Sequence, residues 1–182
     1  MSADEDEDDW TGPVMLILRG NSGSYPDEDG NTHKYTKGAL HEGPAKELAR
    51  LLHYNPKVLD VSGNAKPPKR GEKHGTRDDS EQTLLALRMF RLHSSVVALY
   101  GFSGGGYNVW WILKGMTEAE RGRIERVVVV GVDTDRPQSA YDKSQFKGGG
   151  WDLIYRPNHP ANHMGEPKAL LDDLKAKLAP SP

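Results

Sequence analysis

The 182-residue sequence contains no cysteine. Without a thiol, the chain cannot use a cysteine nucleophile, form a disulfide or hold zinc through cysteine ligands. The sequence also lacks an early apolar stretch behind a basic start, which is the pattern of a secretory signal. No apolar run approaches the roughly 20 residues that cross a bilayer. We therefore expect a cytoplasmic protein with no membrane contact, in which nucleophilic or acid–base chemistry rests on hydroxyl, imidazole and carboxylate groups.

An excess of positive charge is also missing, because 24 Lys and Arg residues stand against 26 Asp and Glu residues, a formal net charge of −2. Nucleic-acid-binding proteins usually carry a basic face or stripe. The local basic cluster around Lys66 to Lys73 lies in a polar stretch, residues 63–79, that we interpret as an exposed loop. Residues 1–12 begin with a nearly continuous acidic run and are expected to form a disordered tail. We predict one domain over residues 13–182 and no nucleic-acid partner.

Apolar runs at regular intervals predict β-strands. They cover residues 14–18, 58–61, 96–100, 127–132 and 153–155. The runs 96–100 and 127–132 are continuously apolar rather than alternating. That pattern is typical of parallel strands that are covered on both faces of a sheet.

Helical patterns separate these runs. Apolar residues recur with helical spacing over residues 42–54, 83–92, 107–114 and 167–178, and Thr117 begins a capping box before a short polar helix. This alternation predicts an α/β fold, a three-layer α/β/α sandwich with a mostly parallel five-stranded sheet. A flavodoxin-like strand order, 2-1-3-4-5, places the run 96–100 at the centre. In such sheets, functional sites form at the carboxyl ends of the strands.

The turn after this central strand carries the clearest functional signal. The residues Gly101-Phe102-Ser103-Gly104-Gly105 join the apolar run 96–100 to the next helical pattern. A serine on a sharp strand-to-helix turn has an exposed hydroxyl, but it adopts strained backbone angles and needs small residues two positions before and after it. Gly101 and Gly105 meet that need. The dipole of the following helix favours negative charge here, which makes the Gly104 N–H a natural oxyanion donor. We predict that Ser103 is a nucleophile.

A glycine-rich turn between a strand and a helix has two other interpretations. It can simply permit close packing, or it can hold a phosphate in a flavodoxin-like module that binds phosphate or a nucleotide. A P-loop is excluded, because no GxxxxGK[ST] pattern occurs, and the segment GFSGGG does not match GxGxxG spacing.

On these residues the chain resembles the α/β-hydrolase family, in a minimal form without a lid domain, similar to cutinase-sized enzymes and small lipases or esterases. The resemblance covers about Val14 to Leu178. It rests on the serine turn (the nucleophile elbow), on an acid after a later strand and on a histidine before the last helix. It implies a serine hydrolase that cleaves a carboxylic ester or related acyl bond of a small-molecule substrate without a cofactor. A catalytically inactive relative that only binds a ligand or partner is the alternative.

The order Ser, Asp, His in this family implies that Asp133 and His163 complete a catalytic triad with Ser103. His163 precedes the final helical pattern, where the family places its base, and His159 is the other candidate. Asp133 is the first residue after the apolar run 127–132. Other carboxylates that remain possible as the acid are Asp135, Asp142 and Asp152.

The loop after the first strand is expected to supply the second oxyanion donor, through the main-chain N–H of Asn21 or Ser22, although the His-Gly signature of the family is absent there. Phe102 and Tyr25 are expected to line the substrate pocket. The spacing of His159 and His163 would suit a metal on a helix, but Pro160 prevents a regular helix at that point, so we expect no metal.

Overall fold

The computed structural model describes residues 9–20, 24–26, 32–34, 42–59, 61 and 81–179, with the backbone alone for 24–26 and 32–34. The predicted loop 63–79 and the acidic residues 1–8 lie outside the described residues. Among residues 9–12, Trp10 stacks on His93 with their ring centroids 3.9 Å apart.

A parallel five-stranded sheet forms the centre of the molecule, with the strand order β4-β1-β5-β6-β7. The strands are β1 (Val14–Leu18), β4 (Asn55–Val58), β5 (Val96–Phe102), β6 (Arg126–Val132) and β7 (Asp152–Pro157). Numbered along the chain, this is the order 2-1-3-4-5, so the predicted fold class and strand order are confirmed. The central strand β5 leads directly into Ser103.

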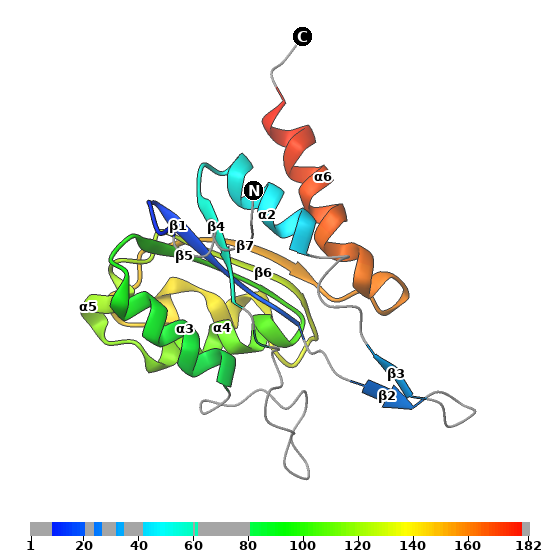
Figure 1. Cartoon of the computed structure of the whole chain (residues 1–182), viewed down its shortest axis with the longest axis horizontal. Coiled ribbons are helices and arrows are strands. Elements are labelled where there is room, and N and C mark those ends of the chain that lie inside the picture. Colours follow the sequence, from blue (N-terminus) through cyan, green and yellow to red (C-terminus); the bar gives the residue numbers. More distant parts are fainter. Residues whose placement is uncertain are drawn as a thin grey trace.

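Helices cover both faces of this sheet (Figure 1). One face is covered by α3 (Glu81–Leu92) and α4 (Gly104–Gly115), and the other by α2 (Glu42–Leu51) and α6 (Glu166–Leu178). Alternate residues of β1 serve the two cores, since Leu16 packs with the α3 and α4 residues and Ile17 with those of α2 and α6. All five β1 residues are buried, which explains why its sequence does not alternate.

Some strands differ from the prediction. The strand β4 begins three residues before the predicted run 58–61 and contains Pro56. A proline lacks the N–H that a sheet ladder uses. It is accommodated there because β4 is an edge strand, which pairs with a neighbouring strand on one side alone. A short antiparallel pair, β2 (Ser24–Pro26) and β3 (Thr32–Lys34), was not predicted.

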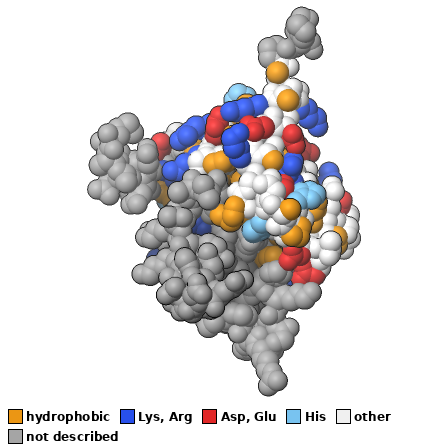
Figure 2. All heavy atoms as spheres, turned by 90° about the vertical axis from the view of Figure 1, so that its right-hand side faces the viewer, with side chains coloured by type: hydrophobic (Ala, Val, Ile, Leu, Met, Phe, Trp, Pro, Cys, Tyr) orange, Lys and Arg blue, Asp and Glu red, His pale blue; other side chains and the backbone are white. Residues whose placement is uncertain are grey.

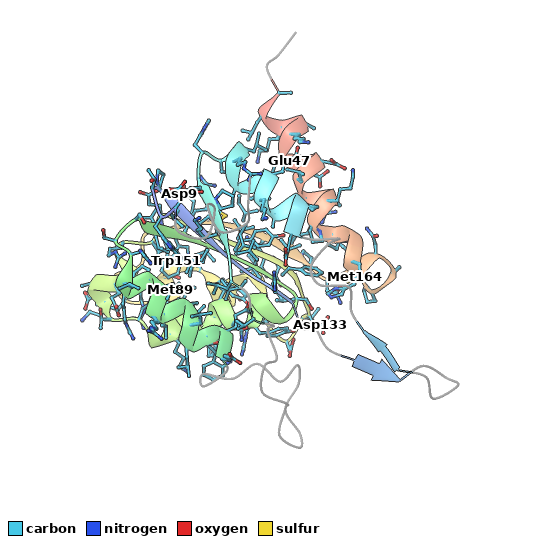
Figure 3. The ribbon with its side chains drawn as sticks, in the orientation of Figure 1. Asp9, Glu47, Met89, Asp133, Trp151 and Met164 are labelled. Atoms are coloured by element: carbon cyan, nitrogen blue, oxygen red, sulfur yellow. The ribbon has the colours of Figure 1, made fainter. Side chains whose placement is uncertain are left out.

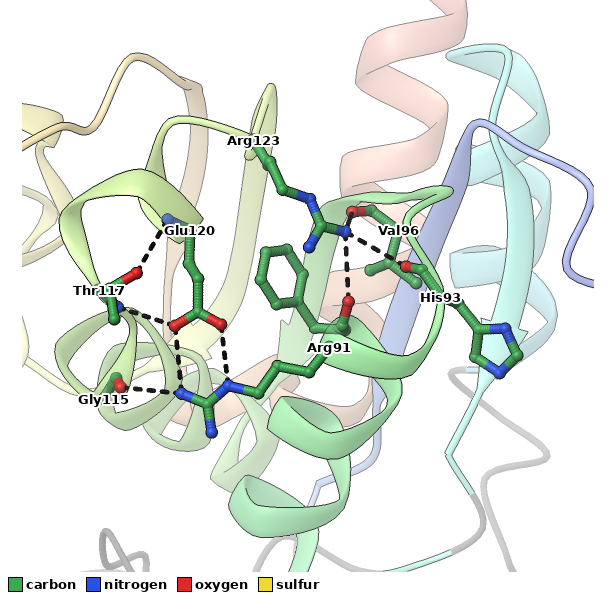
Figure 4. A network of polar contacts seen from close by, with 8 residues as sticks. Arg91, His93, Val96, Gly115, Thr117, Glu120 and Arg123 are labelled. Carbon is green, nitrogen blue, oxygen red and sulfur yellow. Dashed lines mark hydrogen bonds and ion pairs between the residues drawn. The ribbon is translucent and has the colours of Figure 1, made fainter.

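The short helix α5 (Glu118–Arg121) begins with the predicted capping box, shown in Figure 4. The Thr117 hydroxyl accepts a hydrogen bond from the Glu120 N–H at 3.1 Å, and the Glu120 carboxylate accepts one from the Thr117 N–H at 2.9 Å. The same carboxylate accepts hydrogen bonds from Arg91 Nε at 2.8 Å and from its Nη2 at 3.1 Å. This pair links α5 to the end of α3. Within the described part of the chain, no helix is both long and apolar enough to span a membrane.

Candidate active site

Ser103 occupies a strained turn between β5 and α4. Its backbone angles, φ 54° and ψ −120°, lie in a region that non-glycine residues rarely adopt. A Cβ added at Gly101 would lie 2.4 Å from the Gly105 carbonyl oxygen, and one at Gly105 would lie 2.4 Å from the Leu18 carbonyl oxygen. Neither position has room for a side chain, as predicted. The turn therefore presents the Ser103 hydroxyl at the carboxyl edge of the sheet, ahead of the first turn of α4.

His163 reaches this hydroxyl from the segment before α6. Its Nε2 lies 3.0 Å from Ser103 Oγ, within hydrogen-bonding distance. The imidazole stacks on the ring of Phe102 with centroids 5.0 Å apart. Below it, Gly131 adopts a positive φ of 77°, where a Cβ would lie 3.3 Å from His163 Cε1. The imidazole is thus held between an aromatic ring and a glycine that leaves space for it.

The other imidazole nitrogen is bonded to an amide that was not predicted as part of the site. Asn158 Oδ1 lies 2.6 Å from His163 Nδ1. The Nδ2 group of the same amide donates a hydrogen bond to Asp133 Oδ1 at 2.8 Å. Asn158 follows β7 and Asp133 follows β6, so neighbouring strands of the sheet bring the two residues together.

The polarity of these contacts determines where the imidazole proton lies. An ionised carboxylate can only accept hydrogen bonds, so Asp133 requires that Asn158 present its NH₂ group to it. The amide oxygen then faces His163, and because this oxygen also only accepts, Nδ1 must carry the proton. In the neutral imidazole, the lone pair then lies on Nε2, the nitrogen that faces Ser103 Oγ. That is the tautomer in which a histidine can take a proton from a serine.

A tyrosine holds the loop that carries Asp133. The Tyr107 hydroxyl accepts a hydrogen bond from the Asp133 N–H at 3.0 Å and donates one to Asp135 Oδ1 at 2.8 Å. Burial raises the pKa of Tyr107, and the hydrogen bond to Asp135 raises it further, so the hydroxyl remains a protonated donor. Asp135 is therefore engaged by Tyr107.

The loop leaving β1 passes beside the serine. A Cβ added at Gly20 would lie 3.1 Å from the Phe102 carbonyl oxygen and 3.3 Å from Ser103 Cβ. The preceding residue, Arg19, is fixed by the buried Gln82 amide, which accepts from the Arg19 N–H at 2.8 Å and donates to its carbonyl at 2.9 Å. The chain is thus held against the turn directly before the position of the predicted second oxyanion donor.

Comparison with solved structures finds distant similarity at the level of the fold. No family model and no curated protein matches the sequence. The fold is similar to that of a lipase-esterase related protein from Clostridium acetobutylicum ATCC 824, with 17% sequence identity and a TM-score of 0.36. The matched region covers 73% of this chain and 48% of the other, so this chain spans about half the length of that protein. Because this similarity is so low, we infer the chemistry from the residues around Ser103 themselves.

The structure brings most of the predicted site residues to the carboxyl edge of the sheet. Figure 3 shows Asp133 and Met164, the neighbour of His163, at one end of the sheet, with Asp9 and Trp151 at the other. Figure 2 faces the right-hand side of Figure 1 and shows histidine side chains exposed among hydrophobic ones. Gly104 is buried at the first position of α4. Asn21 and Ser22 lie outside the described residues, as does the side chain of Tyr25.

The alternative acids and the alternative base lie in other environments. Asp142 is exposed and accepts a hydrogen bond from the Ser144 N–H at 2.8 Å. Asp152 begins β7, at the opposite edge of the sheet, and its side chain is 78% exposed. His159 is exposed at the start of the 3₁₀ helix η3 (Pro160–Gly165), which contains His163.

An ion pair closes the segment that carries Asn158 and His163. Arg156, near the end of β7, pairs with the buried carboxylate of Glu166 at the start of α6. The same guanidinium donates to Asp173 at 2.6 Å. This ion pair therefore holds the two ends of residues 157–165 close together, which limits how far the His163 imidazole can move from Ser103.

Proposed function

We propose that this protein is a serine hydrolase that cleaves a carboxylic ester or a related acyl bond. The observation that carries the proposal is the 3.0 Å contact between His163 Nε2 and Ser103 Oγ on a strained strand-to-helix turn. A serine and a base within this distance, with a further group orienting the base, form the arrangement that activates a hydroxyl nucleophile. The contact joins residues 60 positions apart in the sequence, so it is a product of the fold.

In the proposed reaction, His163 Nε2 removes the Ser103 hydroxyl proton as the oxygen attacks the substrate carbonyl. The resulting imidazolium gives that proton to the leaving alcohol, and an acyl-enzyme remains. Water then repeats the sequence with the same base, which releases the carboxylic acid and restores the Ser103 hydroxyl. The main-chain N–H of Gly104 is proposed as one oxyanion donor, and that of Asn21 or Ser22 as the second. Loss of one such donor typically costs about 2.7–4 kcal/mol of transition-state stabilisation.

Asn158 is proposed to orient the base directly, and Asp133 is proposed to orient Asn158. Asn158 holds the Nδ1 proton of His163, and Asp133 acts through Asn158 by fixing the orientation of its amide. The proposed arrangement departs from a triad in which a carboxylate alone orients the histidine. The Cys-His-Asn arrangement of papain-like proteases shows that an amide can occupy that place. Tyr25 is proposed to contact the substrate. Phe102, expected from the sequence to line the pocket, is 2% exposed beneath the imidazole, and we propose that it supports His163. The proposed reaction uses no cofactor, and its proposed location is the cytoplasm.

The close packing of the serine turn argues against the phosphate-binding alternative. A Cβ at Gly105 would meet main-chain carbonyl oxygens of Leu18 and Arg19, and a Cβ at Gly106 would lie 2.6 Å from a Val132 methyl group. These glycines are needed because the chain itself fills the space around them.

The proposal is tested by hydrolysis of p-nitrophenyl acetate and p-nitrophenyl butyrate by the purified full-length chain. We expect Ser103→Ala to lower the rate of ester hydrolysis to the background rate in buffer or free imidazole. The matched control is Ser144→Ala, which removes an exposed hydroxyl elsewhere and should leave the rate unchanged. Wild-type activity in Ser103→Ala, or no hydrolysis by the folded wild type, would contradict the proposal.

A further inference from the structure

A pocket of about 460 Å³ lies between α4, α5 and the segment after β6, and its lining includes none of the proposed catalytic residues. This volume is within the usual range of small-molecule sites, roughly 300–1,000 Å³. Aromatic and cationic side chains dominate its walls: Trp110, Phe146, Lys114, Arg121 and Arg136, with Gln145 as a neutral polar group. Among the described residues that line it, none carries a carboxylate.

Two cations share one aromatic wall of this pocket. The Arg136 guanidinium lies 4.1 Å from the centroid of the Trp110 ring, and Lys114 Nζ lies 4.7 Å from the same centroid. Both distances are typical of cation–π contacts. Because these contacts gather two positive charges around one indole, the cations repel each other unless an anion lies between or beside them.

The side chain of Arg136 contains an unsatisfied hydrogen-bond donor. Its Nε is buried and has no hydrogen-bond partner among the residues that the structure describes. A buried donor without a partner costs free energy that a bound acceptor restores. The neighbouring carboxylate of Asp135 accepts a hydrogen bond from Tyr107.

Arg121 contributes charge to the pocket but is held by the main chain. Its guanidinium donates to the carbonyl oxygens of Leu113 at 2.7 Å and Lys114 at 3.1 Å. It also lies 5.5 Å from the Phe146 ring centroid. This side chain is therefore a fixed part of the wall, and the described part of the lining holds no carboxylate to balance its positive charge.

We propose that this pocket binds a small aromatic carboxylate. The partly exposed Trp110 side chain offers apolar contact to a planar ring, and the fork of a guanidinium matches the two oxygens of a carboxylate. An inorganic phosphate would satisfy the cations but would make no apolar contact with Trp110. The site shares no side chain with Ser103, His163, Asn158 or Asp133, so it stands whether or not the chain is a hydrolase.

Isothermal titration calorimetry with 2-naphthoate tests this site, and 2-naphthalenemethanol serves as the uncharged counterpart. We expect the naphthoate to bind at least about tenfold more tightly, because each charge-assisted hydrogen bond is stronger than a neutral one. Arg136→Gln and Lys114→Gln should each weaken naphthoate binding by about tenfold or more. Ser103→Ala should bind naphthoate as the wild type does, which separates this result from the test of hydrolysis.

Lys177→Gln is the matched control, since it removes an exposed cation from α6 on the opposite face of the sheet and should not change the affinity. Circular dichroism establishes that each variant is folded. If Arg136→Gln does not fold, the exposed Lys114 still provides the comparison. Equal affinity for naphthoate and naphthalenemethanol, or unchanged affinity in folded Lys114→Gln, would overturn the proposal.

Discussion

At the scale of single residues, the chain of contacts from Asp133 through Asn158 to His163 controls one proton. Replacement of Asp133 by Asn removes the acceptor that orients the Asn158 amide. The amide can then present its NH₂ group to His163, which favours the tautomer with the proton on Nε2. We expect kcat/KM for ester hydrolysis in Asp133→Asn to fall by about tenfold or more. The loss should be smaller than the roughly 10⁴-fold loss seen when the residue bonded directly to a triad histidine is changed.

A variant that exchanges the carboxylate of Asp133 and the amide of Asn158 tests this arrangement more directly. The double variant Asp133→Asn with Asn158→Asp places a carboxylate directly on His163 Nδ1 and keeps one amide and one carboxylate in the pair. It should be more active than Asp133→Asn alone, as measured by kcat/KM across a range of pH. Asn158→Asp alone puts two carboxylates in contact, which raises the pKa of one of them and should distort the acid limb of that profile. An unchanged rate and pH profile in Asp133→Asn would show that Asp133 has no part in orienting the base.

Gly131 is the residue that makes room for the imidazole. Gly131→Ala would place a methyl group 3.3 Å from His163 Cε1 and 3.0 Å from the Phe102 ring, at a φ of 77°. The backbone strain alone should cost about 1–2 kcal/mol. We expect a lower melting temperature and a lower kcat, because the imidazole is displaced. Gly43→Ala is the control: nothing lies within 4 Å of its added Cβ, and it should preserve both. Equal behaviour of the two variants would count against this role of Gly131.

At the scale of elements, the link between α3 and α5 should make stability depend on pH. The hydrogen bond from Arg91 is the largest cause that lowers the pKa of Glu120, from 4.5 to about 2. Since the folded-state pKa is depressed, the contribution is fully present above about pH 4.5 and is lost as the pH falls toward 2. Glu120→Gln should therefore lower the free energy of unfolding by about 1 kcal/mol at pH 7, a modest value because Arg91 is half exposed.

Urea unfolding of wild type and Glu120→Gln between pH 7 and pH 2.5 measures this effect, and the two curves should converge at the acid end. Glu118→Gln is the control on the same helix, because its pairing with Lys147 at 3.5 Å is exposed and should contribute little. A constant difference between wild type and Glu120→Gln over the whole pH range would contradict the assignment.

The elements also show what the sequence can predict. The strands β1, β5 and β6 were predicted within two residues at each end, because strands buried on both faces appear as continuous apolar runs. The edge strand β4 was misplaced, since Asn55-Pro56-Lys57 has neither apolar character nor the propensity of a strand. Helix α4 begins at Gly104 rather than at the predicted residue 107, because tertiary packing overrides the weak helix propensity of three glycines.

Asn158 was missed for a different reason. An asparagine after a strand is a common loop residue, and its chemistry becomes visible only when His163 and Asp133 lie on either side of it. Like Asp133 after β6, Asn158 is a polar residue at the carboxyl end of a strand, here β7. That position was the available signal for its role.

At the scale of the whole molecule, the contacts of the site depend on how the two cores hold the sheet and helices together. Leu16 is fully buried in the core on the α3 and α4 side. Leu16→Ala should lower the free energy of unfolding by about 2–5 kcal/mol. Leu92→Ala removes the same atoms from a side chain that is 64% exposed and should change stability by no more than about 0.5 kcal/mol. Urea unfolding distinguishes the two, and similar losses would mean that the assigned core is wrong.

The central claim, that Ser103 is an activated nucleophile, is tested most directly by a fluorophosphonate reagent that phosphonylates activated serines. Intact-mass spectrometry should show one adduct per folded wild-type chain, and peptide mapping should place it on Ser103. Ser103→Ala and heat-denatured wild type should show none. Absence of an adduct on the folded wild type, or an adduct that persists in Ser103→Ala, would contradict the claim.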